Sequence, residues 1–257
     1  MSDVRESGVE ASVGPSEGLP PWTFVTAERR ILALDYSIEE LVSLKHTATA
    51  ALRIRPVVRH VKSGVIIPTW AYGRLADSDV ESIDRATLEF AGRLRPSDTE
   101  AKLPLVIPQS FRNLAGRRGR AGLVQATHGS AEALKTRVIV EMTEIGRGTP
   151  PGRLNEVTSL IGAMCKGVFA RLQPGRDAAA AFKDVRLQGL ALDAGDVVGA
   201  DSDVAAALLE IGEQAQGLAP LLIAQGLHSD GFFAVAEVAG FTHVALRGHD
   251  APADAAT

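Results

Sequence analysis

The chain has 257 residues, of which 46% are hydrophobic and 23% are charged, and its formal net charge is −4. This composition is typical of a globular protein with a sizeable core, and the length fits one α/β barrel or two small domains. The small negative charge excludes a general electrostatic attraction to nucleic acid or anionic lipid, so we do not expect nucleic acid as a partner.

Targeting segments and disulfides are not expected. The N-terminus is acidic and polar, and the sequence holds no run of about 18 apolar residues. The single cysteine, Cys165, excludes an internal disulfide and a multi-cysteine metal site. It lies in an apolar stretch, which predicts a buried hydrophobic residue and not a nucleophile. Together these features predict a cytoplasmic protein without a membrane segment.

The two ends differ in composition from the rest of the chain. Residues 1–22 are rich in Ser, Glu, Gly and Pro and predict a flexible tail, and residues 250–257 predict a second one. Between them we expect a single domain, 23–249. Apolar residues spaced three and four apart predict an amphipathic helix over residues 26–51. That helix would dock on the domain or mediate formation of a homodimer.

Short β-branched runs then alternate with helical segments, which is typical of a parallel sheet. Eight strands are expected, at residues 55–61, 64–75, 103–107, 137–143, 167–172, 189–192, 220–224 and 243–246. Helices are expected at residues 79–94, 129–134, 151–164, 178–182, 201–216 and 231–239. The first two strands are too close for a parallel crossover and must form an antiparallel hairpin. This pattern alone fits either an α/β barrel or a doubly wound sheet.

The run Val138–Glu144 is a short apolar segment that ends in two carboxylates, Glu141 and Glu144. A buried parallel strand delivers acidic groups to the open end of a barrel in this way. The segment resembles the Glu-x-Thr-Glu strand of EAL domains, the cyclic di-GMP phosphodiesterase family. The resemblance implies a TIM-like (β/α)8 barrel of EAL type with one antiparallel strand near its start, over residues 30–248.

The other motifs of that family hold different residues here, so the chain resembles a degenerate EAL domain. Its Glu-Ala-Leu-x-Arg motif corresponds to the segment Trp70–Arg74, so Trp70 stands where the family has a metal-binding glutamate. The arginine, which in the family lies near a phosphate of the dinucleotide, is kept as Arg74. Further family residues are replaced by Pro108 for asparagine, Leu172 and Gln173 for two aspartates, Ala191 for the catalytic lysine, and Gln225 and His228 for two glutamates.

These replacements predict that the chain has no catalytic residues, no metal site and no cofactor. A two-metal phosphodiesterase needs several carboxylates to hold two hard divalent cations and activate water. Glu141 alone cannot assemble that site. We expect Glu141 to have a structural role instead, accepting backbone hydrogen bonds or pairing with Arg74.

Two functions are therefore expected, and they belong to different classes. The first is a non-catalytic regulatory domain that acts through a protein partner in bacterial signalling. The alternative is a metal-independent cyclic di-GMP receptor, whose ligand-binding residues would be Arg74, Trp70, Tyr72, Glu141 and Gln225. Against the alternative, Trp70 and Tyr72, two apart on one strand face, would close the pocket. An active cyclic di-GMP phosphodiesterase with a relocated site is the third reading.

Two other features are expected to be incidental. The basic cluster at residues 112–120 contains two glycines and predicts an exposed loop, which is either solvated or contacts an acidic surface. His228 and His243 lie on different predicted segments, and no third residue suggests a shared metal site.

Overall fold

The computed structural model describes residues 22–94, 102–126 and 136–247. Both predicted tails lie outside these ranges, apart from Trp22, and so does the helix predicted at residues 129–134. None of the described helices is long and apolar enough to cross a membrane.

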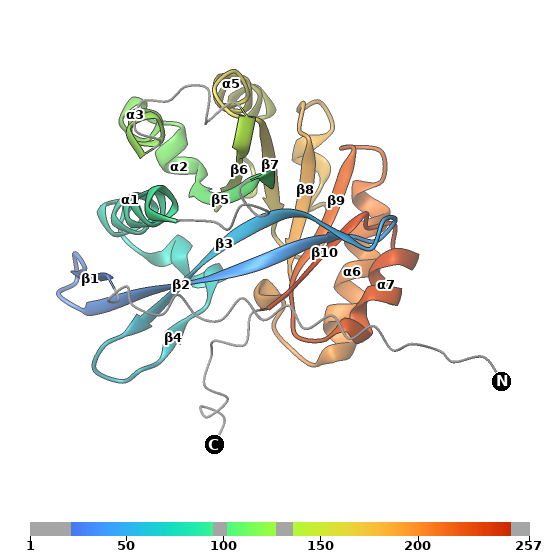
Figure 1. The fold of residues 1–257 in the computed structure, drawn as a ribbon, viewed down its shortest axis with the longest axis horizontal. Helices are drawn as coiled ribbons and strands as arrows, with labels where there is room; N and C mark the ends of the chain where they lie inside the picture. Colours follow the sequence, from blue (N-terminus) through green and yellow to red (C-terminus); the bar gives the residue numbers. More distant parts are fainter. Residues whose placement is uncertain (1–21, 95–101, 127–135, 248–257) are drawn as a thin grey trace.

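Eight strands close into a barrel surrounded by helices (Figure 1). They are β2 (Ile31–Ser43), β3 (Ala48–His60), β5 (Leu105–Ser110), β6 (Val138–Thr143), β7 (Gly167–Leu172), β8 (Gly189–Asp193), β9 (Leu221–Leu227) and β10 (His243–Leu246). Their order is β2-β10-β9-β8-β7-β6-β5-β3, and pairing of β2 with β3 closes the barrel. Only β2 runs antiparallel to both of its neighbours in the barrel. The predicted barrel with one reversed strand near its start is confirmed.

The helix predicted over residues 26–51 is wrong, because this segment forms the longest hairpin of the sheet. β2 pairs with β3 from Leu32 opposite His60 to Ser43 opposite Ala48. β2 buries Leu32 and Leu34 on one face and Leu41 on the other. A strand with apolar residues on both faces also produces spacings of three and four, so the periodicity could not separate strand from helix.

The strand predicted at residues 64–75 is also wrong in most of its length. β4 covers only Ile66–Ile67, and a 3-10 helix, η1, follows at Thr69–Arg74. Pro68 separates the two, since proline has no N–H group for a sheet ladder. The predicted hairpin is present, because β4 pairs antiparallel with β3.

Beyond the barrel, the sheet continues into an antiparallel extension. β1 (Trp22–Val25) pairs with the first residues of β2, and β4 pairs with the end of β3. One face of this extension packs on the first long helix through Leu32, Leu34, Val58, Tyr72 and Ile83. This packing fixes the position of η1 at the end of the barrel.

The helices cover the outside of the barrel. They are α1 (Asp77–Arg93), α2 (Phe111–Leu114), α3 (Arg117–Ala126), α5 (Pro151–Gly162), α6 (Asp201–Ala215) and α7 (Phe233–Val238), with 3-10 turns η3 (Ala180–Phe182), η4 (Ala194–Asp196) and η5 (Asp230–Phe232). The basic cluster at 112–120, predicted as a loop, lies in α2, α3 and the turn that joins them. Gly116 lies in the turn and Gly119 in α3, where a side chain would clash with the Asn113 carbonyl group, so glycine is required at this close approach.

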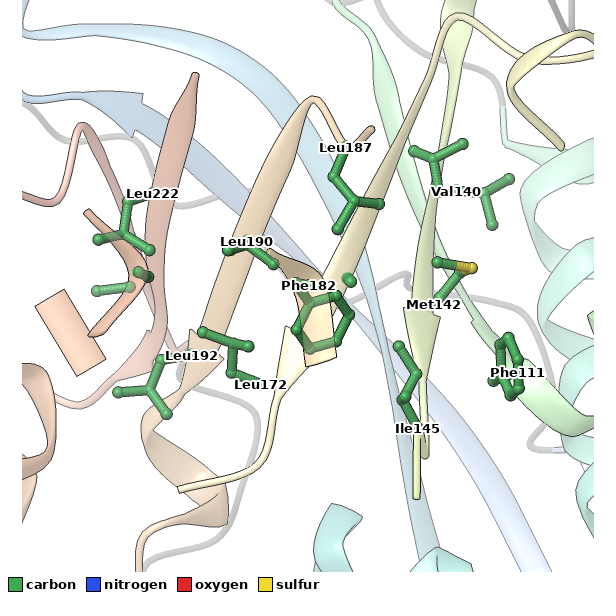
Figure 2. Packing of buried hydrophobic residues seen from close by; sticks show 14 of the residues in the cluster. Phe111, Val140, Met142, Ile145, Leu172, Phe182, Leu187, Leu190, Leu192 and Leu222 are labelled. Atoms are coloured by element: carbon green, nitrogen blue, oxygen red, sulfur yellow. The ribbon is translucent and has the colours of Figure 1, made fainter. Parts of the chain in front are cut away.

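The apolar core has two parts. On the outer face of the barrel, side chains such as Met142, Leu172, Leu190 and Leu222 pack against the helices (Figure 2). Cys165 belongs to this core, where burial raises the pKa of its thiol to about 12. Inside the barrel, a layer of apolar side chains fills the amino-terminal half: Leu41, Ala51, Val106, Ile139, Phe169, Ala191, Ile223 and Ala245. The barrel is therefore a packed core up to this layer.

Candidate functional site

Above the apolar layer, toward the carboxyl ends of the parallel strands, the barrel interior becomes charged. Arg53, on β3, donates hydrogen bonds to three carboxylates: to Glu39 Oε2 at 2.6 Å, Glu141 Oε2 at 3.1 Å and Asp193 Oδ2 at 3.0 Å. The four side chains are at most 1% exposed. Alternation along each strand explains this arrangement, because Arg53 follows the inward-facing Ala51, Glu141 follows Ile139 and Asp193 follows Ala191 by two residues.

Glu141 lies between two guanidinium groups. Its Oε1 accepts a hydrogen bond from Arg171 Nε at 2.9 Å and another from the side-chain amide of Gln225. Burial alone would raise the pKa of Glu141, but the charges of Arg171 and Arg53 outweigh burial and lower the pKa to about 2. Burial is outweighed in the same way at Asp193, whose pKa falls below its usual value. Both carboxylates are therefore ionised at neutral pH.

The charges of this interior layer balance. Arg55 donates to Glu39 Oε1 at 3.2 Å, so Arg53, Arg55 and Arg171 face Glu39, Glu141 and Asp193. A buried network of this kind is tolerated only when its members satisfy one another, because each unpaired ion would cost several kcal/mol.

The residues of this layer do not fit a divalent metal ion. Three carboxylates converge, as at a metal site, but the guanidinium of Arg53 lies where they meet. In the described ranges no group of three His, Cys, Asp or Glu residues could hold a metal ion. Arginine keeps its proton in proteins, so its charge at this position is permanent.

A cleft of about 570 Å³ opens above the charged layer. Its wall includes Trp70 from η1, Glu144 from the end of β6, and Asp196 from η4, and Arg171 and Gln173 reach it from β7. In α/β barrels the carboxyl ends of the strands carry the ligand site, and this cleft occupies that place.

Arg112 fixes one wall of the cleft. Its guanidinium donates to Glu144 Oε2 at 3.0 and 2.7 Å, to Asp77 Oδ1 at 2.7 Å, and to the carbonyl oxygens of Tyr72 and Leu75 at 3.1 and 3.2 Å. One side chain thus ties η1 and the start of α1 to the end of β6. Glu144 itself has a φ of 55°, a left-handed conformation that is uncommon for a residue other than glycine. Such strain at the end of a barrel strand is typical of functional sites.

Asp196 is the least satisfied acidic group of the cleft. Its side chain is 8% exposed, and its Oδ1 is buried without a hydrogen-bond partner among the described residues. Burial raises the pKa of Asp196 above its usual value, and the nearby charge of Arg171 only partly opposes this shift.

Solved structures of other proteins share this fold. No protein-family model and no curated protein matches the sequence. The solved structure of the PaMucR phosphodiesterase in complex with c-di-GMP matches with a TM-score of 0.61 and 15% identity, over 85% of this chain and 91% of that chain. The fold is that of an EAL domain.

Two further EAL structures agree. The Xanthomonas citri FimX EAL domain, in complex with c-diGMP, matches with a TM-score of 0.58 and 17% identity, over 83% of this chain and 85% of that chain. The EAL enzyme Bd1971, in its cGMP-bound form, matches with a TM-score of 0.59 and 14% identity over 83% of this chain. This chain spans 61% of the Bd1971 chain.

Within this EAL fold, the five residues predicted to bind ligand do not share one surface. Gln225 donates a side-chain hydrogen bond to Glu141 inside the barrel. Tyr72 is buried and its hydroxyl donates to the Pro56 carbonyl at 3.5 Å. Burial raises its pKa further above the usual range. Only Trp70, 45% exposed, and Arg74 remain near the cleft, with the guanidinium 5.2 Å from the ring centroid.

Two structural expectations are corrected by these positions. Trp70 and Tyr72 lie on a 3-10 turn, where one is exposed and the other buried, so together they do not close the pocket. Glu141 pairs with Arg53 and Arg171, not with Arg74. His228 and His243 contact different residues: His228 is 3.2 Å from Asp201, and His243 contacts Thr242.

No motif in the sequence pointed to Arg53 or Arg171, and Arg112 was predicted only as part of an exposed basic loop. A usable signal was present in Leu52–Val58, where arginines occupy alternate positions of an apolar strand and so must point to one face. Arg171 carries the same signal in β7, a strand whose six residues are all buried. A buried arginine requires acidic partners, which points to the barrel interior.

Proposed function

We propose that this chain is a non-catalytic EAL-like domain that regulates a signalling process in bacteria through contact with a protein partner. One observation carries the first half of the proposal: Arg53 engages Glu39, Glu141 and Asp193 together. A divalent cation would have to displace a tethered, permanently charged group from a dry interior. Without bound metal ions, water at this site keeps its high pKa and is a poor nucleophile.

The second part of the proposal, regulation through a protein partner, rests on the intact fold. The barrel and its packed core are intact, while Arg53 occupies the position where three carboxylates converge. An intact scaffold whose interior holds a cation of its own supports a role that is carried by its surface. The partner is a different protein or a second copy of this chain. Light scattering of the purified protein at several concentrations tests whether two copies of the chain form a dimer.

A second candidate function is favoured by the cleft. Its volume of about 570 Å³ falls in the range of ligand pockets, and its wall offers an aromatic ring and arginine side chains. Two of the matching EAL structures are described as complexes with c-di-GMP. In this alternative the chain is a cyclic di-GMP receptor that binds the nucleotide without metal ions and leaves it intact.

One experiment tests both candidates. The purified protein is titrated calorimetrically with cyclic di-GMP, once with Mg²⁺ and once with EDTA, and the nucleotide is then analysed by chromatography. We expect intact nucleotide under both conditions. Binding that is equal in Mg²⁺ and EDTA supports the receptor function, and the absence of binding removes it and leaves the scaffold function.

The Glu141→Gln variant is the matched control for hydrolysis. Turnover that disappears both in EDTA and in this variant would overturn the non-catalytic proposal. Turnover that persists in the variant comes from a contaminating enzyme, because a metal-dependent barrel would lose a ligand.

A further inference from the structure

Arg171 differs from Arg53, the central cation of the layer, in how its donors are used. Its Nε donates to Glu141 at 2.9 Å, but its Nη1 lies 3.8 Å from Asp193 Oδ2 and 4.0 Å from Asp196 Oδ2. Both separations are too long for a hydrogen bond. Within the described ranges, no acceptor therefore lies at hydrogen-bond distance from either terminal nitrogen of Arg171.

Two other arginines beside the cleft, Arg53 and Arg112, have no such capacity. Arg53 uses all three nitrogens on carboxylates. Arg112, which also lines the cleft, uses its three nitrogens on Glu144, Asp77 and two carbonyl groups. The side chain of Arg171 is only 7% exposed, yet it forms part of the cleft wall. The terminal nitrogens of Arg171 are not among the fully buried atoms without a partner, so its free donors are open to an acceptor that enters the cleft.

We propose that Arg171 binds a phosphate oxygen of the ligand and supplies, as a fixed cation, the positive charge that divalent metal ions would otherwise bring. The inference rests on the receptor function proposed above. Guanidinium groups bind phosphate oxygens with short, charge-assisted hydrogen bonds, and Nη1 and Nη2 provide the donors. Trp70, on the wall formed by η1, offers a ring on which a base can stack.

Asp196 sets the strength of this contact. Its carboxylate lies 4.0 Å from Arg171 Nη1, so its negative charge opposes an incoming phosphate. Removing that charge while keeping the shape of the side chain should tighten phosphate binding. Loss of the Arg171 charge and loss of the Asp196 charge should therefore change the affinity for phosphate in opposite directions.

The measurement uses tryptophan fluorescence. The chain has two tryptophans, and a Trp22→Phe background leaves Trp70 as the reporter at the cleft. Cyclic di-GMP, guanosine and inorganic phosphate are titrated separately, each in Mg²⁺ and in EDTA. Arg171→Gln, Arg171→Lys and Asp196→Asn are compared with Arg93→Gln, an exposed arginine on α1 that controls for net charge.

For Arg171→Gln we expect a loss of affinity for cyclic di-GMP of about tenfold or more, with unchanged affinity for guanosine. Arg171→Lys should retain part of the affinity, and Asp196→Asn should bind more tightly than the parent.

Equal affinity of Arg171→Gln and the parent would overturn the inference, as would binding that is lost in EDTA. If Arg171→Gln does not fold, as judged by circular dichroism, weaker or unchanged binding by Asp196→Asn overturns it. Failure of the parent to bind any of the three probes would overturn the receptor function itself.

Discussion

At the scale of single residues, Arg53 determines the character of the barrel interior. It satisfies three carboxylates that would otherwise repel one another in a space closed to water. Isolated buried ions are far more costly than buried pairs, so the stability of the layer depends on this one cation.

The Arg53→Met variant should therefore lose about 3–5 kcal/mol of unfolding free energy at neutral pH, because it leaves uncompensated buried carboxylates. Urea unfolding followed by circular dichroism measures this loss. The control is Arg93→Met, which removes an exposed arginine 3.6 Å from Glu89 and should change stability by less than about 0.5 kcal/mol. A similar loss in both variants would contradict the role given to Arg53.

Shortening the same side chain further gives a second test. In Arg53→Ala, the oxygens of Glu39, Glu141 and Asp193 surround a position that a hard cation can take. Mn²⁺ should raise the melting temperature of Arg53→Ala and leave the parent unchanged. Equal responses of the two proteins would show that Arg53 does not stand in for a metal ion.

At the scale of secondary-structure elements, two polar contacts hold the helical segments to the barrel. Asp84, on α1, accepts hydrogen bonds from the Ser110 backbone N–H at the end of β5 at 3.0 Å and from the Asn113 amide at 2.6 Å. Arg112 ties η1 to the end of β6. Both contacts lie at the end of the barrel that carries the cleft.

Burial raises the pKa of Asp84 to about 7, above its value of 3.8 in an unfolded chain. Between these two pKa values the folded state holds a proton that the unfolded state has released. Raising the pH through this window therefore favours unfolding, and the loss is complete above the folded pKa. The Asp84→Asn variant cannot ionise and should be more stable than the parent at pH 8 by a few kcal/mol, with little difference at pH 4.

Thermal melts of both proteins from pH 4 to pH 8 measure this difference, and other titrating groups cancel in the comparison. A difference between the two proteins that does not change with pH would contradict the raised pKa of Asp84.

Loss of Arg112 should loosen η1. In Arg112→Ala, the amide protons of Ala71 and Leu75, which bond within this turn to Pro68 and Tyr72, should exchange with solvent at least about tenfold faster. Hydrogen-exchange NMR gives the rates. Arg118→Ala, which removes an 83% exposed side chain on α3, is the control and should leave these rates unchanged. Unchanged exchange in Arg112→Ala would mean that η1 is held by its packing alone.

At the scale of the whole molecule, β2 connects the two ends of the chain. It pairs with β3 on one side and with β10 on the other, so residues near the start close a barrel that residues near the end complete. Such long-range pairing should make unfolding cooperative.

Urea unfolding followed by tryptophan fluorescence and by far-ultraviolet circular dichroism should therefore give coincident single transitions. Trp22 and Trp70 report on β1 and η1, whereas circular dichroism reports on all strands and helices. An earlier fluorescence transition would show that the antiparallel extension unfolds separately from the barrel.

The sequence by itself determined the α/β class and the approximate positions of β5 to β10, because short apolar runs flanked by turns and helical segments are local signals. The pattern left a barrel and a doubly wound sheet open, and the resemblance to EAL domains implied the barrel. It also located the carboxylate Glu141 at the end of a buried strand, since strand ends can be counted along the chain. It failed at residues 26–51, where a strand buried on both faces has no period of two that distinguishes it from a helix.

Only the tertiary structure decided what those carboxylates do. Arg53 and Arg171 are far from Glu141 in sequence, and closure of the barrel brings them to within hydrogen-bond distance. The same closure places Arg171 in the wall of the cleft, with its Nη1 3.8 Å from Asp193 Oδ2, a separation too long for a hydrogen bond. Charge pairing in a buried interior depends on distances across the barrel, which no local pattern in the sequence encodes.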